Sequence, residues 1–242
     1  MPTTITALDP TLPTLLAESP ALGDLLAPRP DPSAELDRQL ELYGALGVLA
    51  LAERAGLSPA ALQDAVAPLR AALPPADAPV GARDPSDHAP FVLVLDVDPN
   101  DAAPAMRRGA RRGVSVIDHE EAATYRPIDG VVVPGAPAYL LVDVDSGSGL
   151  CNVRPEDALG VIRSRGRSPL TLGEGVALTI VRPDLLRPNR CYSLLASRAG
   201  NQRVPAVWIS EKRPKLGWCW DRNPHTWLGA ASAGGRVGGA AQ

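Results

Sequence analysis

The segment 208–229 places the strongest constraint on how this chain folds. It reads WISEKRPKLGWCWDRNPHTWLG and holds all four tryptophans of the 242-residue chain, together with both lysines. Aromatic residues make up only 4% of the sequence, so the rest of the core must be built from aliphatic side chains. Indole rings bury a large apolar area. Four of them in one short segment predict either a plug in the core or the wall of a binding site.

A binding site is the first interpretation of this segment. Trp218, Trp220 and Trp227 offer broad apolar faces to a flat organic ligand. Arg222 and Asn223 supply the few polar contacts that small-molecule pockets contain. The alternative is that the tryptophans fill an aliphatic core that lacks other large residues. Both arrangements satisfy the same need for burial, so the sequence leaves pocket and plug open.

The same segment contains the parts of a cysteine nucleophile. Cys219 and His225 lie six residues apart across a turn, where the imidazole could act as the base and Asp221 could orient it. Strand periodicity argues against this arrangement, because it places Trp218 and Trp220 on one face and Cys219 on the other. Buried cysteines are also often inert. A reactive thiol predicts a Cys219 pKa below the usual value of about 8.5.

Two similar stretches, FVLVLDVDPND and YLLVDVDSGSG, each join an apolar strand to an Asp-Val-Asp triplet. Residues two apart on a strand share a face, so Asp96 with Asp98, and Asp143 with Asp145, are predicted to project together. Paired carboxylates can bind a hard cation such as Mg²⁺. Aspartate is also common where strands end in turns, and this second explanation requires no metal.

A transition-metal site is a further hypothesis. Cys151, Cys191, Cys219 and His225 offer thiolate and imidazole ligands of the kind that bind Zn²⁺ or iron. The chain has no Cys-x-x-Cys pair and no closely spaced pair of histidines, so the spacing gives this hypothesis little support. The identity of any cofactor is left open.

The N-terminal part is predicted to form a helical hairpin at 31–74, after a proline-punctuated segment at 1–30. Asp31 and Ser58, each followed by proline, are predicted N-caps of two helices. Leucines recur at spacings of three and four, and Gly56 is expected to end the first helix. The hairpin is interpreted as a scaffold whose apolar face offers a surface for homo-oligomer formation.

The predicted fold class is α+β, with the helical hairpin followed by a mixed α/β domain built on a central sheet. A linker rich in proline, aspartate and alanine at 75–90 precedes the mixed domain, which is placed at 91–229. Within this domain, Thr171 and Glu174 match a capping box ahead of an apolar helix. The tail at 230–242 is rich in glycine and alanine and is predicted to be disordered.

Charge and composition limit the classes of partner. The formal net charge is −3, with acids and bases interspersed, which gives no reason to expect a nucleic-acid partner. No stretch approaches about 20 uninterrupted apolar residues and the first residues lack a signal-peptide pattern, so no membrane association is expected. Three widely spaced cysteines suit a reducing compartment. The expected location is therefore cytoplasmic.

Several stretches carry a family resemblance: FVLVLDVD, RPIDGV, YLLVDVD, GRSPLTLGEG, RVPAVWIS and GWCWDRNPHTWLG. Together they resemble an uncharacterised actinobacterial domain-of-unknown-function family, and the last stretch is similar to its C-terminal hallmark. The resemblance covers roughly residues 91–236. The family has no established activity, so the resemblance implies no mechanism and no catalytic residues.

The function predicted from these patterns is small-molecule binding at 208–229, with catalysis by Cys219 and His225 as its enzymatic version. The competing prediction is a non-catalytic protein that binds a partner protein or acts as a scaffold, with the tryptophans as a structural core plug. The two differ in a visible way. A pocket buries the tryptophans around a cavity with His225 facing in, whereas a partner surface exposes a contiguous apolar patch.

Overall fold

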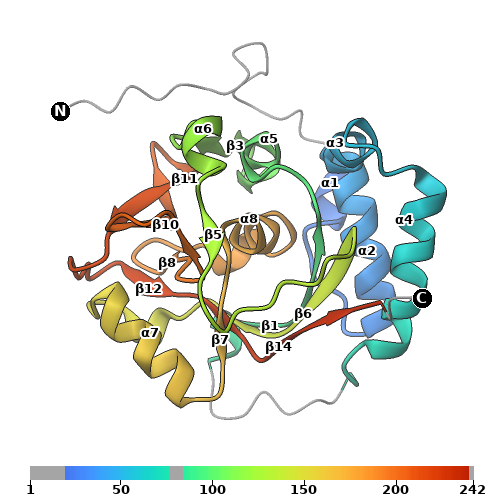
Figure 1. Cartoon of the computed structure of the whole chain (residues 1–242). Coiled ribbons are helices and arrows are strands. Elements are labelled where there is room, and N and C mark those ends of the chain that lie inside the picture. The colour runs from blue at the N-terminus through green and yellow to red at the C-terminus, as the bar shows by residue number, and fades with distance from the viewer. Residues whose placement is uncertain (1–19, 77–83, 240–242) are drawn as a thin grey trace.

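A central helix, α8 (Leu172–Val181), lies between two β-sheets and organises the fold (Figure 1). The structure is a computed structural model, and it describes residues 20–76 and 84–239. Helices and strands are mixed along these residues, with helices first, which confirms the predicted α+β class. None of the helices in the described ranges has both the length and the apolar character needed to cross a bilayer.

The helices that precede the first sheet are α1 (Pro20–Asp24), α2 (Pro32–Ala45), α3 (Val48–Arg54) and α4 (Pro59–Val66), followed by the 3-10 turn η1 (Ala67–Ala72). Both predicted N-caps are present. The Asp31 carboxylate accepts a hydrogen bond from the Ala34 amide at 2.8 Å, and the Ser58 hydroxyl accepts one from the Ala61 amide at 3.2 Å. Gly47, with a φ of 81°, divides the predicted first helix into α2 and α3, because a left-handed residue interrupts an α-helix.

The first sheet has the strand order β1-β6-β13-β7, and β14 also pairs with β6. Its strands are β1 (His88–Leu95), β6 (Ala138–Asp145), β7 (Ser168–Pro169), β13 (Ser232–Ala233) and β14 (Gly235–Gly238). β1 and β6 are antiparallel along their whole length, from His88 opposite Asp145 to Leu95 opposite Ala138. The two Asp-Val-Asp triplets each follow or end one of these strands, so they lie at opposite ends of the sheet.

Side chains of α2 cover the outer edge of β1. The Tyr43 hydroxyl donates to the Leu93 carbonyl at 2.6 Å, and the Gln39 side chain accepts a hydrogen bond from the Leu93 amide at 2.7 Å. All three residues are buried. An edge strand inside a protein needs such partners, because a buried backbone group without a hydrogen bond is destabilising. The N-terminal helices therefore pack on the same core as the sheet.

The second sheet has the order β12-β8-β10-β11-β4. Its strands are β4 (Val114–Ser115), β8 (Cys191–Ser193), β10 (Arg203–Ser210), β11 (Arg213–Trp220) and β12 (Leu228–Ala230). β10 and β11 form a hairpin whose two turn residues, Glu211 and Lys212, have φ values of 53° and 63°. Two positive φ values are typical of the turn that matches the twist of a hairpin.

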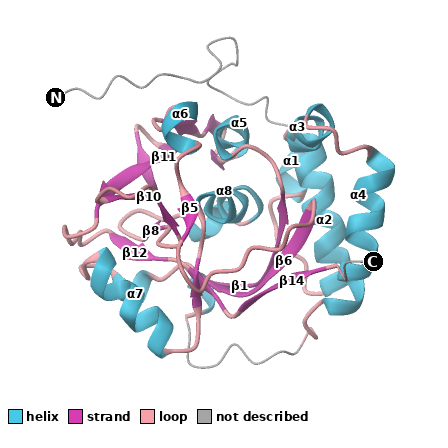
Figure 2. Cartoon of the chain, viewed as in Figure 1, coloured by secondary structure: helices cyan, strands magenta, loops and turns pink. Residues whose placement is uncertain are grey.

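The remaining elements are short connections, with the exception of α7. They are η2 (Pro85–Asp87), α5 (Pro99–Ala102), η3 (Ala103–Ala105), β2 (Arg107–Arg108), β3 (Arg111–Arg112), α6 (His119–Ala122), β5 (Arg126–Pro127), η4 (Ser148–Leu150), α7 (Pro155–Ser164), η5 (Pro183–Leu185) and β9 (Ser197–Arg198). Figure 2 shows how these pieces surround the two sheets, with α7 on the outside near β12.

The central helix α8 is buried along nearly all of its length. It contacts β1 of the first sheet and β10 of the second. Thr179 lies 2.6 Å from the Tyr192 hydroxyl of β8, and a side chain at Gly175 would collide with Leu194. A helix that is apolar all round is expected in the core of a protein. Such a helix holds the residues at its two ends in fixed positions.

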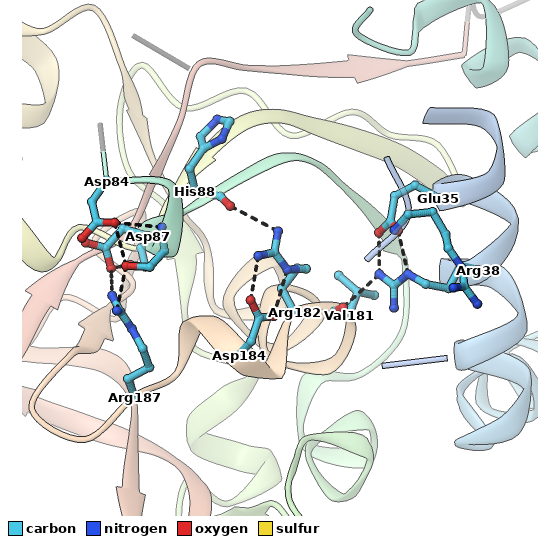
Figure 3. Close-up of polar contacts among 12 residues, drawn as sticks. Glu35, Arg38, Asp84, Asp87, His88, Val181, Arg182, Asp184 and Arg187 are labelled. Carbon is cyan, nitrogen blue, oxygen red and sulfur yellow. Dashed lines mark hydrogen bonds and ion pairs between the residues drawn. The ribbon is translucent and has the colours of Figure 1, made fainter. Parts of the chain in front are cut away.

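Charged side chains neutralise both ends of α8. At the N-terminal end, Thr171 and Glu174 form the predicted capping box, and the buried Glu174 carboxylate accepts a hydrogen bond from Arg236 Nη2 at 2.7 Å. At the C-terminal end, Arg38 pairs with Glu35 and donates to the Val181 carbonyl at 3.1 Å (Figure 3). An acid at the N-terminus and a base at the C-terminus both interact favourably with the helix dipole.

The C-terminal residues differ from the prediction of a disordered tail. Residues 230–238 form the end of β12 and the strands β13 and β14, so that prediction is wrong for them. Glycine contributes to the difference, because Gly234 packs closely against Asp143 and an added Cβ would lie only 3.0 Å from that side chain. Residues 240–242, most of the 1–30 segment and 77–83 of the linker lie outside the described residues.

Candidate functional site

The four tryptophans form two separate pairs. The rings of Trp208 and Trp227 lie 6.5 Å apart between centroids, and those of Trp218 and Trp220 lie 5.1 Å apart in an edge-to-face arrangement. The hairpin register explains this division. Trp208 is paired with Lys215, so the two side chains lie on the same face of the hairpin. Trp218 and Trp220 follow Lys215 by three and five positions in the same strand, so the alternation of side chains places them on the opposite face. A single wall built from all four indoles is not formed.

Each pair has its own cationic or polar neighbour. The Arg203 guanidinium lies over the Trp218 ring, 4.1 Å from its centroid, and the His225 ring lies 4.9 Å from that of Trp227. Trp220 is 49% exposed, while Trp218 and Trp227 are partly buried against the core. The two pairs therefore lie on opposite faces of the β10–β11 hairpin, and Trp220 is the most accessible of the four rings.

Cys219 points to the face opposite Trp218 and Trp220, as the periodicity predicts. It is buried, its sulfur lies 3.9 Å from the Ser193 hydroxyl, and burial raises its pKa to about 11. Asp221 pairs with Arg198 at 2.9 Å. In the described part of the chain no hydrogen bond joins Cys219, His225 and Asp221, so the geometry of a nucleophile and its base is not assembled.

We expect Cys219 to react slowly with iodoacetamide near neutral pH. With a pKa of about 11, roughly one thiol in a thousand is ionised at pH 8, and the burial of the side chain restricts access. Mass-spectrometric measurement of labelling against pH should give a rate that rises steeply only in strongly alkaline solution. The urea-denatured protein is the control. Faster labelling of the folded protein than of this control would contradict the expectation and restore the nucleophile hypothesis.

The other two residues predicted at the tryptophan segment lie on its outer turn. Arg222 and Asn223 are exposed. Arg222 Nε lies 3.5 Å from a Glu156 carboxylate oxygen of α7, and the Asn223 amide donates to the Trp220 carbonyl at 3.1 Å. These contacts fix the turn against α7, and they leave both side-chain ends facing solvent.

Of the four predicted metal-binding aspartates, the second pair already has protein partners. Asp143 binds His88 Nε2 at 2.9 Å and Arg167 Nη1 at 2.6 Å, and Asp145 accepts a hydrogen bond from the Gly147 amide at 2.7 Å. The positive φ of Asp143, 55°, breaks the strand alternation that would place it beside Asp145. The buried His88, which falls within the linker predicted at 75–90, is thereby part of this group of side chains.

The first pair of aspartates has a different environment. Asp96 lines a cavity, whereas Asp98 caps the short helix α5 and lies beside Asp101 and His119. Throughout the described ranges, this group of three is the one in which histidine, cysteine and acidic ligand atoms converge closely enough for a metal ion. The cysteines therefore do not assemble with His225 into the Cys/His metal site considered from the sequence.

The cavity that Asp96 lines, here named the α8 cavity, has a volume of about 310 Å³. It opens beside the first turn of α8 and is bounded by the end of β1, the start of β6 and the segment around β5. Most of its wall is formed by proline, valine, leucine and alanine side chains. Its polar residues are Asp96, Tyr125, Tyr139, Thr171 and Ser197.

The two tyrosines present neutral phenols to the α8 cavity. The Tyr139 hydroxyl donates to Glu174 at 2.9 Å and that of Tyr125 to Glu121 at 3.3 Å. Burial, reinforced by the neighbouring carboxylate, raises the pKa of each phenol above its ordinary value. Because the hydroxyl protons point to these carboxylates, the phenol oxygens are left as hydrogen-bond acceptors.

The part of the α8 cavity wall that α8 itself forms has no side chain at Gly173 and leaves free space there. Gly173 lies in the first turn of the helix, and a side chain added there would meet no atom within 4 Å. The Ser197 hydroxyl oxygen accepts a hydrogen bond from the Leu172 amide at 2.9 Å, which leaves its proton for another acceptor. The sequence did not identify this cavity, because its lining comes from five separate stretches between residues 94 and 197.

A second cavity lies among the N-terminal helices. It has a volume of about 450 Å³ and an apolar wall that includes Leu40 of α2, Leu49 of α3 and Leu62 of α4. Glu53 and Arg70 stand at its polar border. This is the part of the molecule that the sequence assigned to oligomer formation.

Comparisons with known proteins place the chain in a family. Searches of curated proteins and of solved structures return no match. A family of unknown function (DUF5701) matches residues 45–239, which include α3, both sheets, α8 and the α8 cavity. The protein therefore belongs to this family of unknown function, DUF5701.

Proposed function

We propose that the protein binds a small organic molecule in the α8 cavity. The observation that carries the proposal is a cavity of about 310 Å³ with an apolar wall and a few converging polar groups. Ligand sites in proteins have this size and this composition. The cavity is built on α8 and on the ends of β1 and β6, which are rigid parts of the core. Precise binding is best supported by such elements.

The polar lining indicates the chemistry of the ligand. Asp96 is the one acidic residue in the wall of the α8 cavity, and the Tyr125 and Tyr139 oxygens are acceptors. Acceptors and a carboxylate favour a ligand with a positive charge or several hydrogen-bond donors. The proposed ligand is therefore an amine with an apolar or aromatic body. The aromatic rings of the tyrosines can also contribute cation–π contacts.

The test uses phenethylamine as a probe and Gly173→Leu as a blocking variant. We expect saturation-transfer NMR to detect phenethylamine bound to the wild-type protein and to lose most of the signal in the variant, because the new side chain occupies the open wall of the α8 cavity. Leucine is compatible with the helix, since it is a good helix former and Gly173 has an ordinary φ.

The matched control is Gly160→Leu in α7, where an added side chain also meets nothing within 4 Å. This variant should bind the probe as the wild-type protein does. Phenylacetate, which has a similar body and the opposite charge, should bind more weakly, and Asp96→Asn should reduce the difference. Equal binding of phenethylamine to the Gly173→Leu and wild-type proteins would exclude the cavity as its site.

A second candidate is self-association through the N-terminal helices, and the apolar cavity among α2, α3 and α4 favours it. Light scattering on the purified protein measures whether one or two chains are present. The tryptophan segment supports a weaker version of ligand binding, because the exposed Trp220 packs edge-to-face against Trp218. No nucleic-acid partner is proposed, given the net charge of −3. All three cysteines are free, which supports a cytoplasmic location.

A further inference from the structure

Two short helices bring three metal-binding side chains together at one end of the molecule. Asp98 caps α5, Asp101 lies within it, and His119 begins α6, which contacts α5 (Figure 1). One ligand atom from each residue lies within 4.8 Å of the others. The three residues are separated by up to 21 positions in sequence, so the fold creates this group and the sequence pattern does not reveal it.

Capping interactions hold the group in place. Asp98 Oδ1 accepts hydrogen bonds from the Asn100 amide at 2.8 Å and the Asp101 amide at 3.2 Å. These bonds fix the orientation of the carboxylate, and the same oxygen, Oδ1, lies nearest to His119 Nδ1. On the other helix, Asp118 caps α6 through the Glu121 amide at 2.6 Å and so positions His119. A preformed arrangement of metal-ligand atoms lowers the entropic cost of ordering them around an ion.

The imidazole of His119 lies close to both carboxylates without a hydrogen bond to either. His119 Nδ1 lies 3.8 Å from Asp98 Oδ1, and His119 Nε2 lies 3.7 Å from Asp101 Oδ1. Hydrogen bonds between such atoms are shorter, about 2.7–3.2 Å. Ligand atoms that share an ion at about 2.1 Å stand roughly 3–4 Å apart. Only one nitrogen of His119 can bind the same ion as the carboxylates, and the three residues do offer one ligand atom each within 4.8 Å of the others. Over the described residues the ion pairs of Asp98 and Asp101 are with His119, and no arginine or lysine neutralises either carboxylate.

We propose that Asp98, Asp101 and His119 bind a divalent transition-metal ion. Two carboxylate oxygens and one imidazole nitrogen form a mixed ligand set, which favours Zn²⁺ or Mn²⁺ over Mg²⁺ or Ca²⁺, since the last two prefer oxygen ligands alone. All three residues are exposed, so solvent fills the remaining coordination positions. The two carboxylates balance the charge of the ion without help from other residues.

The ion lies at the border of the α8 cavity. Asp96, Val97 and Pro99, which surround Asp98 in the chain, line that cavity, and so does Ala122 of α6. A molecule in the cavity can therefore reach an open coordination position of the ion. The metal proposal does not rest on the proposed cavity ligand, because it requires only the three side chains and is tested without any organic molecule.

The test is isothermal titration of untagged, EDTA-treated and dialysed protein with ZnCl₂. We expect saturable binding of one ion per chain, and weaker or undetectable heat with MgCl₂. His119→Ala and Asp101→Asn should each weaken Zn²⁺ binding by about 10-fold or more. Both side chains are exposed, so the fold should be kept, which circular dichroism checks. Asp98→Asn is avoided, because that residue also caps α5.

Glu120→Gln is the matched control, since it removes an exposed carboxylate of α6 next to His119. This variant should bind Zn²⁺ with wild-type affinity. Two results would overturn the proposal: no saturable binding up to about 1 mM, or equal affinity in the wild-type and His119→Ala proteins. Equal weakening by Glu120→Gln would likewise contradict it, because it would indicate general attraction of cations to an acidic surface.

Discussion

Replacing Arg236 by alanine is expected to lower the free energy of unfolding by about 3–5 kcal/mol. Arg236 forms hydrogen bonds to both carboxylate oxygens of Glu174, which is fully buried in the first turn of α8. It also donates to Ser168 Oγ at 2.6 Å and the Pro169 carbonyl at 2.9 Å. The substitution leaves a buried carboxylate without its counter-charge, and removing one partner of such a pair is much more destabilising than replacing both.

Urea denaturation followed by circular dichroism measures this loss. Arg222→Ala is the surface control, because its ion pair with Glu156 is exposed and pairs of that kind contribute about 0–1 kcal/mol. The double variant Glu174→Gln with Arg236→Met should recover part of the stability, since glutamine can keep the capping box and no buried charge remains. A change below about 1 kcal/mol for Arg236→Ala would refute the assignment of Arg236 as the counter-charge.

The second large effect is expected at Gly147, where alanine should destabilise the protein by about 4 kcal/mol or more. Gly147 follows β6 with a φ of 77°, and an added Cβ would collide with the backbone carbonyl of Ala230 in β12. An added Cβ at Gly229 would in turn collide with the backbone carbonyl of Gly147. Backbone atoms cannot move aside as a flexible side chain can. The contact joins the end of the first sheet to an edge of the second.

A matched comparison separates the collision from the backbone conformation. Gly130 has a similar φ of 81°, and an added Cβ there meets nothing within 4 Å. Gly130→Ala should therefore show only the left-handed penalty of about 1–2 kcal/mol. Thermal unfolding of the two variants gives the difference. Equal shifts in Tm would mean that the two sheets can separate slightly at Gly147 without loss of stability.

The sequence predicts those features of the fold that depend only on residues close together in the chain. The caps at Asp31 and Ser58 and the capping box of Thr171 and Glu174 are present where the sequence indicated them. These features depend on contacts within one turn of helix. At Gly47 the leucine spacing continues while the helix is interrupted, so periodicity alone does not predict this break. The class of the fold followed from the same local elements.

The candidate site could not be read from the sequence in the same way. The concentration of rare tryptophans predicts a site at 208–229, yet strand pairing places the rings on two faces of the β10–β11 hairpin. The α8 cavity is assembled from common residues of five stretches, and only tertiary contacts bring them together. Asp98 was recognised as an acidic residue at a strand end, whereas its neighbour His119 belongs to another helix. Long-range placement, and not residue type, determined which groups meet.

The pairing of β14 with β6 has a consequence for how the chain reaches this structure. β6 lies between β1, which precedes it by about fifty residues, and β13 and β14, which follow about ninety residues later. Until those strands arrive, one side of an apolar strand is an unpaired edge, and such edges associate with other chains. Contacts between distant segments also form slowly. Docking of β13 and β14 therefore closes this side of β6, and it depends on residues that come last in the described part of the chain.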